Sequence, residues 1–261
     1  MRYKNSNQRT KDYLARFDKN KVLQNLVGTD TPVILDIGAN IGQTVEKLKI
    51  IWENAVIHSI EPLPEAYQEL YLTKGIMSDV YVYNHALGSV NGWQEFNVNK
   101  HQPMLSGFYK LNENSKDSIA INKPEKAHKN FLESEPTQIP VMTLDTFTKQ
   151  HNIENIDIIK MDVQGAEPEI LEHGIETLKN TRIVLTELSL YDLYEKQCSF
   201  YDIEKTLIPL GFELYDVAHV SKNPMNGRTD WVDLIYLKKV KKRVDFPESL
   251  CYINKHKHKT I

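Results

Sequence analysis

A short glycine-containing segment is the first part of the chain whose residue types could bind a ligand. Asp36, Gly38, Asn40 and Gly42 lie in the sequence DIGANIG, directly after an apolar run. Glycine lets the backbone turn tightly and approach a ligand closely, and asparagine is one of the few other residues that tolerate a positive φ. A helix beginning after Gly42 would attract an anionic group, and Asp36 would accept hydrogen bonds from a cationic amine. The segment therefore predicts a site for an amino-acid group or for the pyrophosphate of a dinucleotide.

An acid further along the chain narrows this choice. Glu61 follows a second apolar run, over residues 55–60, and precedes Pro62. An acid at this position binds ribose hydroxyls in dinucleotide and adenosyl sites alike. The first loop reads GANIG, however, and not the GxGxxG of nicotinamide dinucleotide binders. An adenosyl ligand is favoured, with a nicotinamide-dependent oxidoreductase as the alternative. We expect Pro62, and Ala86 at the end of a third run, to border the adenine.

Carboxylates and a lysine recur where the fourth and fifth apolar runs end. Lys160 and Asp162 are two residues apart, so their side chains leave the same side of a strand. Glu187 ends the fifth run, and Glu167 opens the next helix, where it could also complement the helix dipole. Such a set could deprotonate a hydroxyl during its attack on an electrophile. We predict Asp162 as the group nearest that proton, with Lys160 and Glu187 orienting or tuning it, and with Asp162 also bordering the cofactor.

No metal site is expected from these residues. Cys198 and Cys251 are the two cysteines, and no His/Cys spacing has the zinc pattern or indicates a disulfide framework. The carboxylates leave room for Mg²⁺ or Ca²⁺, but no loop of oxygen ligands is evident.

The elements that must position these residues alternate between strand and helix. Such alternation predicts an α/β fold of the Rossmann-like class, with a mainly parallel seven-stranded sheet and an antiparallel edge strand. The predicted strands are residues 33–37, 55–60, 80–87, 156–161, 182–186, 212–220 and 231–237, with an accessory strand over 138–144. The predicted helices are residues 12–27, a stretch after Gly42, and residues 64–72, 166–178 and 200–210.

Three further parts of the chain surround this domain. We expect an N-terminal helical cap over residues 1–30, a catalytic domain over 31–240 and a basic tail over 241–261. Residues 99–138 are polar and without sustained periodicity, which predicts a lid or a substrate-facing insertion. Three tyrosines after the fifth strand could form an aromatic platform for a sugar ring, or could simply pack in the core: Tyr191, Tyr194 and Tyr201.

Composition limits the partners. The overall net charge is −3, and because the tail is basic the rest of the chain is acidic, which argues against stable nucleic-acid binding. The tail could make weak contact with an anionic surface. No apolar run is long enough to span a membrane, and the first residues lack the apolar centre of a secretory signal, so we expect cytoplasmic residence. The oligomeric state stays open.

Taken together, the segments resemble the FkbM-type methyltransferases. The resemblance rests on VILDIGANIGQT at 33–44, HSIEPLPEAY at 58–67, VYNHALGSVNG at 82–92, LDTF at 144–147, IDIIKMDVQGAEPEIL at 156–171 and VLTEL at 184–188. The family has a class I methyltransferase fold, uses S-adenosyl-L-methionine and usually methylates hydroxyl groups on sugars, glycans, lipids or secondary metabolites.

The resemblance also implies roles for individual residues. It implies cofactor contacts at Gly38, Asn40 and Glu61, and extends them to Asp36 and Asp162. Members of the family often carry glutamate where this chain has Gln164, so a mechanism that needs an acid there is not expected. Two different functions stay open beside this one. The first is an RNA 2′-O-methyltransferase, which the acidic body disfavours and the basic tail favours, and the second is a cofactor-binding module without turnover.

Overall fold

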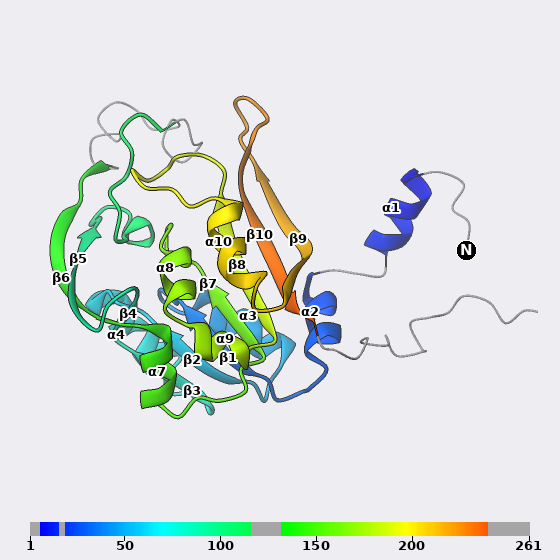
Figure 1. Ribbon diagram of the computed structural model, residues 1–261, viewed down its shortest axis with the longest axis horizontal. Coiled ribbons are helices and arrows are strands. Elements are labelled where there is room, and N and C mark those ends of the chain that lie inside the picture. The colour runs from blue at the N-terminus through cyan, green and yellow to red at the C-terminus, as the bar shows by residue number, and fades with distance from the viewer. Residues whose placement is uncertain (1–5, 16–18, 116–131, 240–261) are drawn as a thin grey trace, which may run out of the picture. The chain divides into compact units, whose positions relative to one another are not determined.

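A seven-stranded sheet forms the centre of the computed structural model, which describes residues 6–15, 19–115 and 132–239. Within these residues the strand order is β3-β2-β1-β7-β8-β10-β9 (Figure 1). The strands are β1 (Val33–Ile37), β2 (Val56–Ile60), β3 (Val80–Tyr83), β7 (Ile158–Met161), β8 (Ile183–Ser189), β9 (Phe212–Lys222) and β10 (Thr229–Lys238). Pairing is parallel from β3 to β8, and β10 pairs antiparallel with both β8 and β9. The predicted α/β class and its mainly parallel sheet are confirmed.

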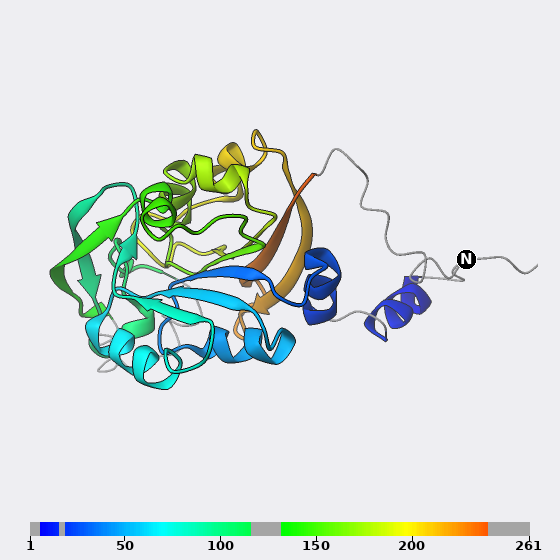
Figure 2. The ribbon, with the colours of Figure 1, turned by 90° about the horizontal axis from the view of Figure 1, so that it is seen from below.

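Helices cover both faces of this sheet. Figure 2 shows α3 (Gln43–Ile51) and α4 (Pro64–Thr73) on one face, in blue and cyan, and the green and yellow helices on the other. The second group is α7 (Leu144–Gln150), α8 (Glu167–Glu172), α9 (Ile175–Lys179) and α10 (Phe200–Leu207). The strands between the layers are buried on both sides, which is why they read as continuous apolar runs. The sheet grows outward in both directions from β1 and β7, and ligands bind at such a switch point.

A second sheet of three strands lies beside the first, in the order β4-β6-β5. Its strands are β4 (Ala86–Leu87), β5 (Gly92–Val98) and β6 (Glu135–Met142). The accessory strand predicted over 138–144 is present as β6, whereas β5 was not predicted.

The prediction of one strand over residues 80–87 was wrong. Asn84 interrupts it, because its side-chain amide donates hydrogen bonds of 3.0 Å to the carbonyls of Glu61 and Pro62. The chain then leaves the first sheet and continues into the second as β4.

Two predicted helices are each divided. The helix predicted over 166–178 breaks at Gly174, where a Cβ atom would come within 2.4 Å of the Leu144 side chain, so the break lets α9 approach α7 closely. The helix predicted over 12–27 is replaced by α1 (Ser6–Leu14) and α2 (Lys19–Val27).

The chain separates into two compact units. Of the described residues, one unit contains those from 27 to 238, and the other contains residues 6–15, 19–26 and 239. The basic tail predicted over 241–261 lies outside the described residues, as do residues 116–131 of the predicted insertion. No helix in the described part of the chain is both long and apolar enough to cross a membrane.

Candidate active site

A cavity of about 260 Å³ opens where the strands of the first sheet end. One side is formed by residues that follow β1, β2 and β3, and the other by residues of β8 and β10, and residues 103–106 and Phe108 also line it. Its walls include seven of the predicted site residues: Gly38, Asn40, Glu61, Pro62, Ala86, Asp162 and Glu187. The sequence therefore located this edge of the sheet correctly, while the roles of the individual residues stay predictions.

The glycine loop, residues 38–42, is held against the end of β2. Gly38 and Ala39 donate backbone hydrogen bonds of 3.0 and 3.1 Å to the Ile60 carbonyl, and Asn40 has a φ of 49°. A Cβ atom on Gly38, whose φ is 78°, would lie 2.1 Å from the carbonyl oxygen of Asp162. Only glycine permits this approach between the β1 and β7 ends.

Gly42 has a different place from the one predicted. It does not line the cavity; it precedes α3 with a φ of 94°, and a Cβ atom there would lie 2.6 Å from the Lys74 side chain. The lack of a side chain at this position lets the start of α3 pack closely against α4. The structure does not bring Gly42 to the cavity where the cofactor contacts were predicted.

Glu61 is 5% exposed and holds two parts of the site together. Its Oε2 accepts the Asn40 N–H and its Oε1 accepts the Leu63 N–H, both at 2.8 Å. Burial raises the pKa of Glu61 to about 7, against the opposing effect of these two hydrogen bonds. A carboxylate has about four lone-pair positions, so each oxygen keeps one for a hydroxyl in the cavity. This pair of acceptor oxygens fits the two hydroxyls of a ribose. His85 also lines the cavity, and its buried Nδ1 has no partner among the described residues.

Asp36 and Lys160 form a buried pair behind the cavity wall. Asp36 is fully buried, and neither of its carboxylate oxygens has a hydrogen-bond partner among the described residues. Lys160 Nζ lies 3.4 Å from Asp36 Oδ1 and 3.7 Å from Asp162 Oδ2. Burial raises the pKa of Asp36, and burial alone would lower that of Lys160, but the two carboxylates raise it instead. Lys160 is thus a buried cation that lies between two carboxylates, those of Asp36 and Asp162.

Asp162 faces the cavity at the end of β7. Gln164 Nε2 donates a 2.7 Å hydrogen bond to Asp162 Oδ1, and Tyr194 in turn donates one of 2.6 Å to Gln164 Oε1. Asp162 Oδ2 therefore has the freer lone pairs. Glu187 lies across the sheet on β8, where burial and then the charges of Asp162 and Asp233 raise its pKa to about 8.

Glu167 does not line the cavity. It is 3% exposed, accepts a 3.1 Å hydrogen bond from the Val163 N–H, and has its pKa raised to about 7, chiefly by burial. Of its two predicted roles, the geometry favours the structural one, at the start of α8.

Glu167→Gln is expected to change how stability depends on pH. The folded protein keeps a proton on Glu167 that the unfolded chain releases between about pH 4.5 and 7, so the free energy of unfolding falls as pH rises through this window. Glutamine keeps the acceptor for Val163 and has no charge to bury. The variant should match wild type near pH 4.5 and exceed it by about 1–3 kcal/mol at pH 8 in urea titrations. Glu154→Gln, at an exposed site, is the control; equal pH dependence in wild type and Glu167→Gln would contradict the prediction.

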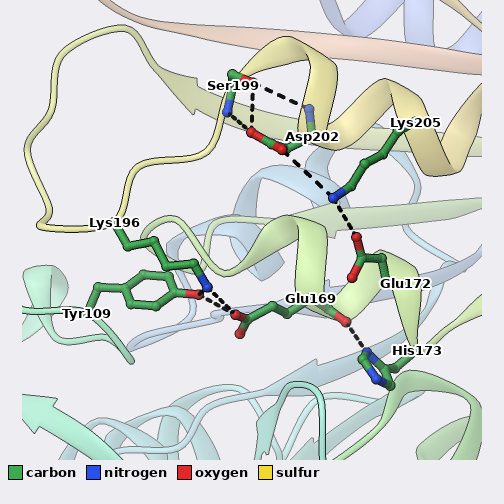
Figure 3. Close-up of polar contacts among 8 residues, drawn as sticks. All are labelled: Tyr109, Glu169, Glu172, His173, Lys196, Ser199, Asp202 and Lys205. Atoms are coloured by element: carbon green, nitrogen blue, oxygen red, sulfur yellow. Dashed lines mark hydrogen bonds and ion pairs between the residues drawn. The ribbon is translucent and has the colours of Figure 1, made fainter.

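Residues 103–109 lie in the described start of the predicted insertion, and we call them the covering segment. They line part of the cavity and contact α8. Pro103, Met104, Leu105 and Ser106 line the cavity. Further along the segment, Tyr109 hydrogen-bonds to Glu169 of α8, and Lys196 contacts both residues, at 3.1 and 3.0 Å (Figure 3).

The loop that carries Lys196 is itself held in place. It leads into α10 through a capping box between Ser199 and Asp202. Lys205 of α10 forms an ion pair of 2.7 Å with Glu172 of α8. Figure 3 shows these two side chains facing each other. These contacts join the covering segment, α8 and α10 into one wall.

Several cavity residues were not predicted, and they come from elements distant in sequence. Ser189 and Trp231 are register partners on β8 and β10, a pairing that no local pattern reveals. Of the two alternatives for the three tyrosines, the structure favours packing in the core over a platform: Tyr191 and Tyr194 are buried, Tyr201 is 74% exposed, and none of the three lines the cavity.

Comparison with known proteins matches the chain to a family model and to a related sequence. The model of the methyltransferase FkbM domain matches residues 36–214. The 2-O-methyltransferase NoeI of Sinorhizobium fredii (strain NBRC 101917 / NGR234) is 32% identical over 167 residues, which are 64% of this chain and 67% of NoeI.

Two solved structures are among those that align with the chain. The fibrillarin of Aeropyrum pernix, in complex with natively bound S-adenosyl-L-methionine, has a TM-score of 0.42 at 15% identity, covering 82% of this chain and 73% of fibrillarin. The precorrin-6y C5,15-methyltransferase of Geobacter metallireducens GS-15 has a TM-score of 0.44 at 12% identity, covering 84% and 86%.

Proposed function

The chain belongs to the FkbM family of methyltransferases, and we propose that it methylates a hydroxyl group of a small molecule or glycan. The methyl donor is S-adenosyl-L-methionine, whose sulfonium group supplies a methyl carbon that is already electrophilic. The observation that carries the proposal is the pair of acids at the two sides of the cavity, Glu61 for a ribose and Asp162 for the acceptor. The 2-O activity named for NoeI supports an oxygen acceptor.

The first side of the cavity would bind the donor. Glu61 has one lone pair on each oxygen for the ribose hydroxyls, and Gly38 and Asn40 bring the loop backbone next to it. Pro62 and Ala86 lie in the wall beyond, where we place the adenine.

Asp162 would hold the acceptor and take its proton. With Oδ1 engaged by Gln164, the proton goes to Oδ2, which faces Lys160 at 3.7 Å. The remaining contribution is alignment of the hydroxyl with the methyl group, which is worth several kcal/mol when a site is dry and rigid. Glu187 holds a proton of its own at neutral pH, since its pKa lies near 8, and can donate a hydrogen bond to the acceptor.

We further propose that the enzyme acts in the cytoplasm and has no stable nucleic-acid partner. The acidic body supports an enzyme without a stable nucleic-acid partner. Cys198 is a free, buried thiol, as expected of a protein from the reducing cytoplasm.

Titration calorimetry with Glu61→Ala tests the donor site. Wild type should bind S-adenosyl-L-methionine and S-adenosyl-L-homocysteine, and not NAD⁺. The substitution removes the ribose acceptor and leaves the Asn40 and Leu63 N–H groups without their partner, so affinity should fall about 100-fold, or about 2.7 kcal/mol.

Glu65→Ala, on the exposed first turn of α4, is the matched control and should bind like wild type. Binding of NAD⁺ alone would overturn the methyltransferase proposal.

A further inference from the structure

We propose that the part of the cavity beyond Asp162 is a subsite for an uncharged sugar ring that stacks on Trp231. This inference rests on the proposed function and specifies its acceptor. The subsite is lined by residues of β8 and β10, of the loop after β8 and of the covering segment: Leu105, Ser106, Glu187, Ser189, Leu193 and Trp231.

The register of β8 and β10 places the key side chains on one face. Trp231 pairs with Ser189, and Asp233 pairs with Glu187, in an antiparallel ladder. Directly opposed residues point to the same face of a sheet, as do residues two apart on one strand. Trp231, Ser189 and Glu187 therefore form one surface, and all three line the cavity.

The distance from the reacting group suits a single ring. The strand order places β10 two positions from β7, about 10 Å across the sheet. Trp231 also lies two residues further along the ladder than the level of Asp162, which adds about 7 Å along the strands and gives about 12 Å between the two backbones. A pyranose lying between them would have its C–H face on the indole and a hydroxyl toward Asp162. The covering segment also lines this part of the cavity, through Leu105 and Ser106.

The polar groups of the subsite match hydroxyls. Ser106 and Ser189 can each donate and accept, and Glu187 adds a carboxyl group, so a ring with several hydroxyls finds several partners. An aromatic surface with a few convergent hydrogen-bonding groups binds an amphipathic ring with defined orientation.

The charge of the subsite excludes anionic acceptors. The carboxylate of Asp162 lines it, and that of Asp233 lies next to the protonated Glu187, whereas Lys160, which is 3.7 Å from Asp162, lies behind the wall and is also paired with Asp36. A phosphate or carboxylate on the acceptor would meet these acids in a partly desolvated space. The acceptor we assign is therefore a neutral glycoside and not a phosphodiester, a uronate or a phospholipid headgroup.

Saturation-transfer NMR on the protein loaded with S-adenosyl-L-homocysteine tests the assignment without turnover. Calorimetry first establishes that the donor product is bound, so a failed donor site is recognised separately. The probes are methyl α-D-glucopyranoside, methyl α-L-fucopyranoside, the uronate methyl α-D-glucopyranosiduronate and the flat phenol catechol.

The neutral glycosides should receive saturation at their ring protons, and the uronate should bind at least about tenfold more weakly. Trp231→Ala should abolish the glycoside signal. Trp93→Ala, which removes an indole that is 70% exposed on β5 outside the cavity, should leave the signal unchanged.

Trp231→Phe keeps an aromatic surface and should retain part of the signal if the alanine variant folds poorly. Equal binding of uronate and neutral glycoside, preference for catechol, or no glycoside binding by the product-loaded protein would each overturn the assignment. So would glycoside binding that survives in Trp231→Ala.

Discussion

Asp162→Asn is expected to lower the rate of methyl transfer by about two to four orders of magnitude while leaving the affinity for S-adenosyl-L-methionine within about threefold. The asparagine Oδ1 can still accept the hydrogen bond from Gln164, so the loop after β7 keeps its geometry. What is lost is the oxygen that takes the proton of the acceptor, next to Lys160. Transfer of a labelled methyl group to a glycoside acceptor measures the rate, and calorimetry measures donor binding.

Asp79→Asn provides the control for this variant. Asp79 is exposed, and its positive φ of 63° is one that asparagine adopts readily, so activity should be unchanged. Full turnover by Asp162→Asn with normal donor binding would show that the proton goes elsewhere, and Glu187 would be the next residue to replace.

Gly38→Ala should cost the protein several kcal/mol of stability and its ability to bind the donor. The new Cβ atom would overlap the backbone carbonyl of Asp162, and neither backbone can withdraw without separating the β1 and β7 ends. Large effects of this kind arise where a side chain meets backbone at a strained φ, and about 4 kcal/mol is a reasonable scale.

Gly28→Ala separates the two sources of this cost. Gly28 has nearly the same φ, 72° against 78°, but nothing lies within 4 Å of its Cβ position. It should therefore lose only the 1–2 kcal/mol, roughly, of a left-handed alanine. Urea titrations of both variants give the difference, and equal losses would mean that contact with Asp162 is unimportant.

The edge of the sheet that carries the site could be predicted because strand ends are local features. Each parallel strand is a short apolar run, and the polar residue after it must lie at the same edge as its neighbours. Glu61, Asp162 and Glu187 follow or end such runs, and all three line the cavity.

Burial and register could not be predicted in the same way. Asp36 and Lys160 are as polar as Asp162, yet they lie behind the wall, because the chain direction at each strand end decides which side chain emerges. Trp231 enters the site through pairing between β8 and β10, which are far apart in sequence, and such non-local contacts leave no periodic signal. The split between β3 and β4 depends likewise on Asn84 reaching the carbonyls of another loop.

The two sides of the cavity are encoded in separate stretches of the chain. The part that we propose for the donor is contributed mainly by residues 37–87, whereas Glu187, Ser189 and Trp231 come from strands much later in the chain. For protein engineering this separation means that Ser189 and Trp231 can be varied while the proposed donor residues are kept. The same separation offers natural variation a route to new products, since positions on β8 and β10 can change independently of the loop after β1.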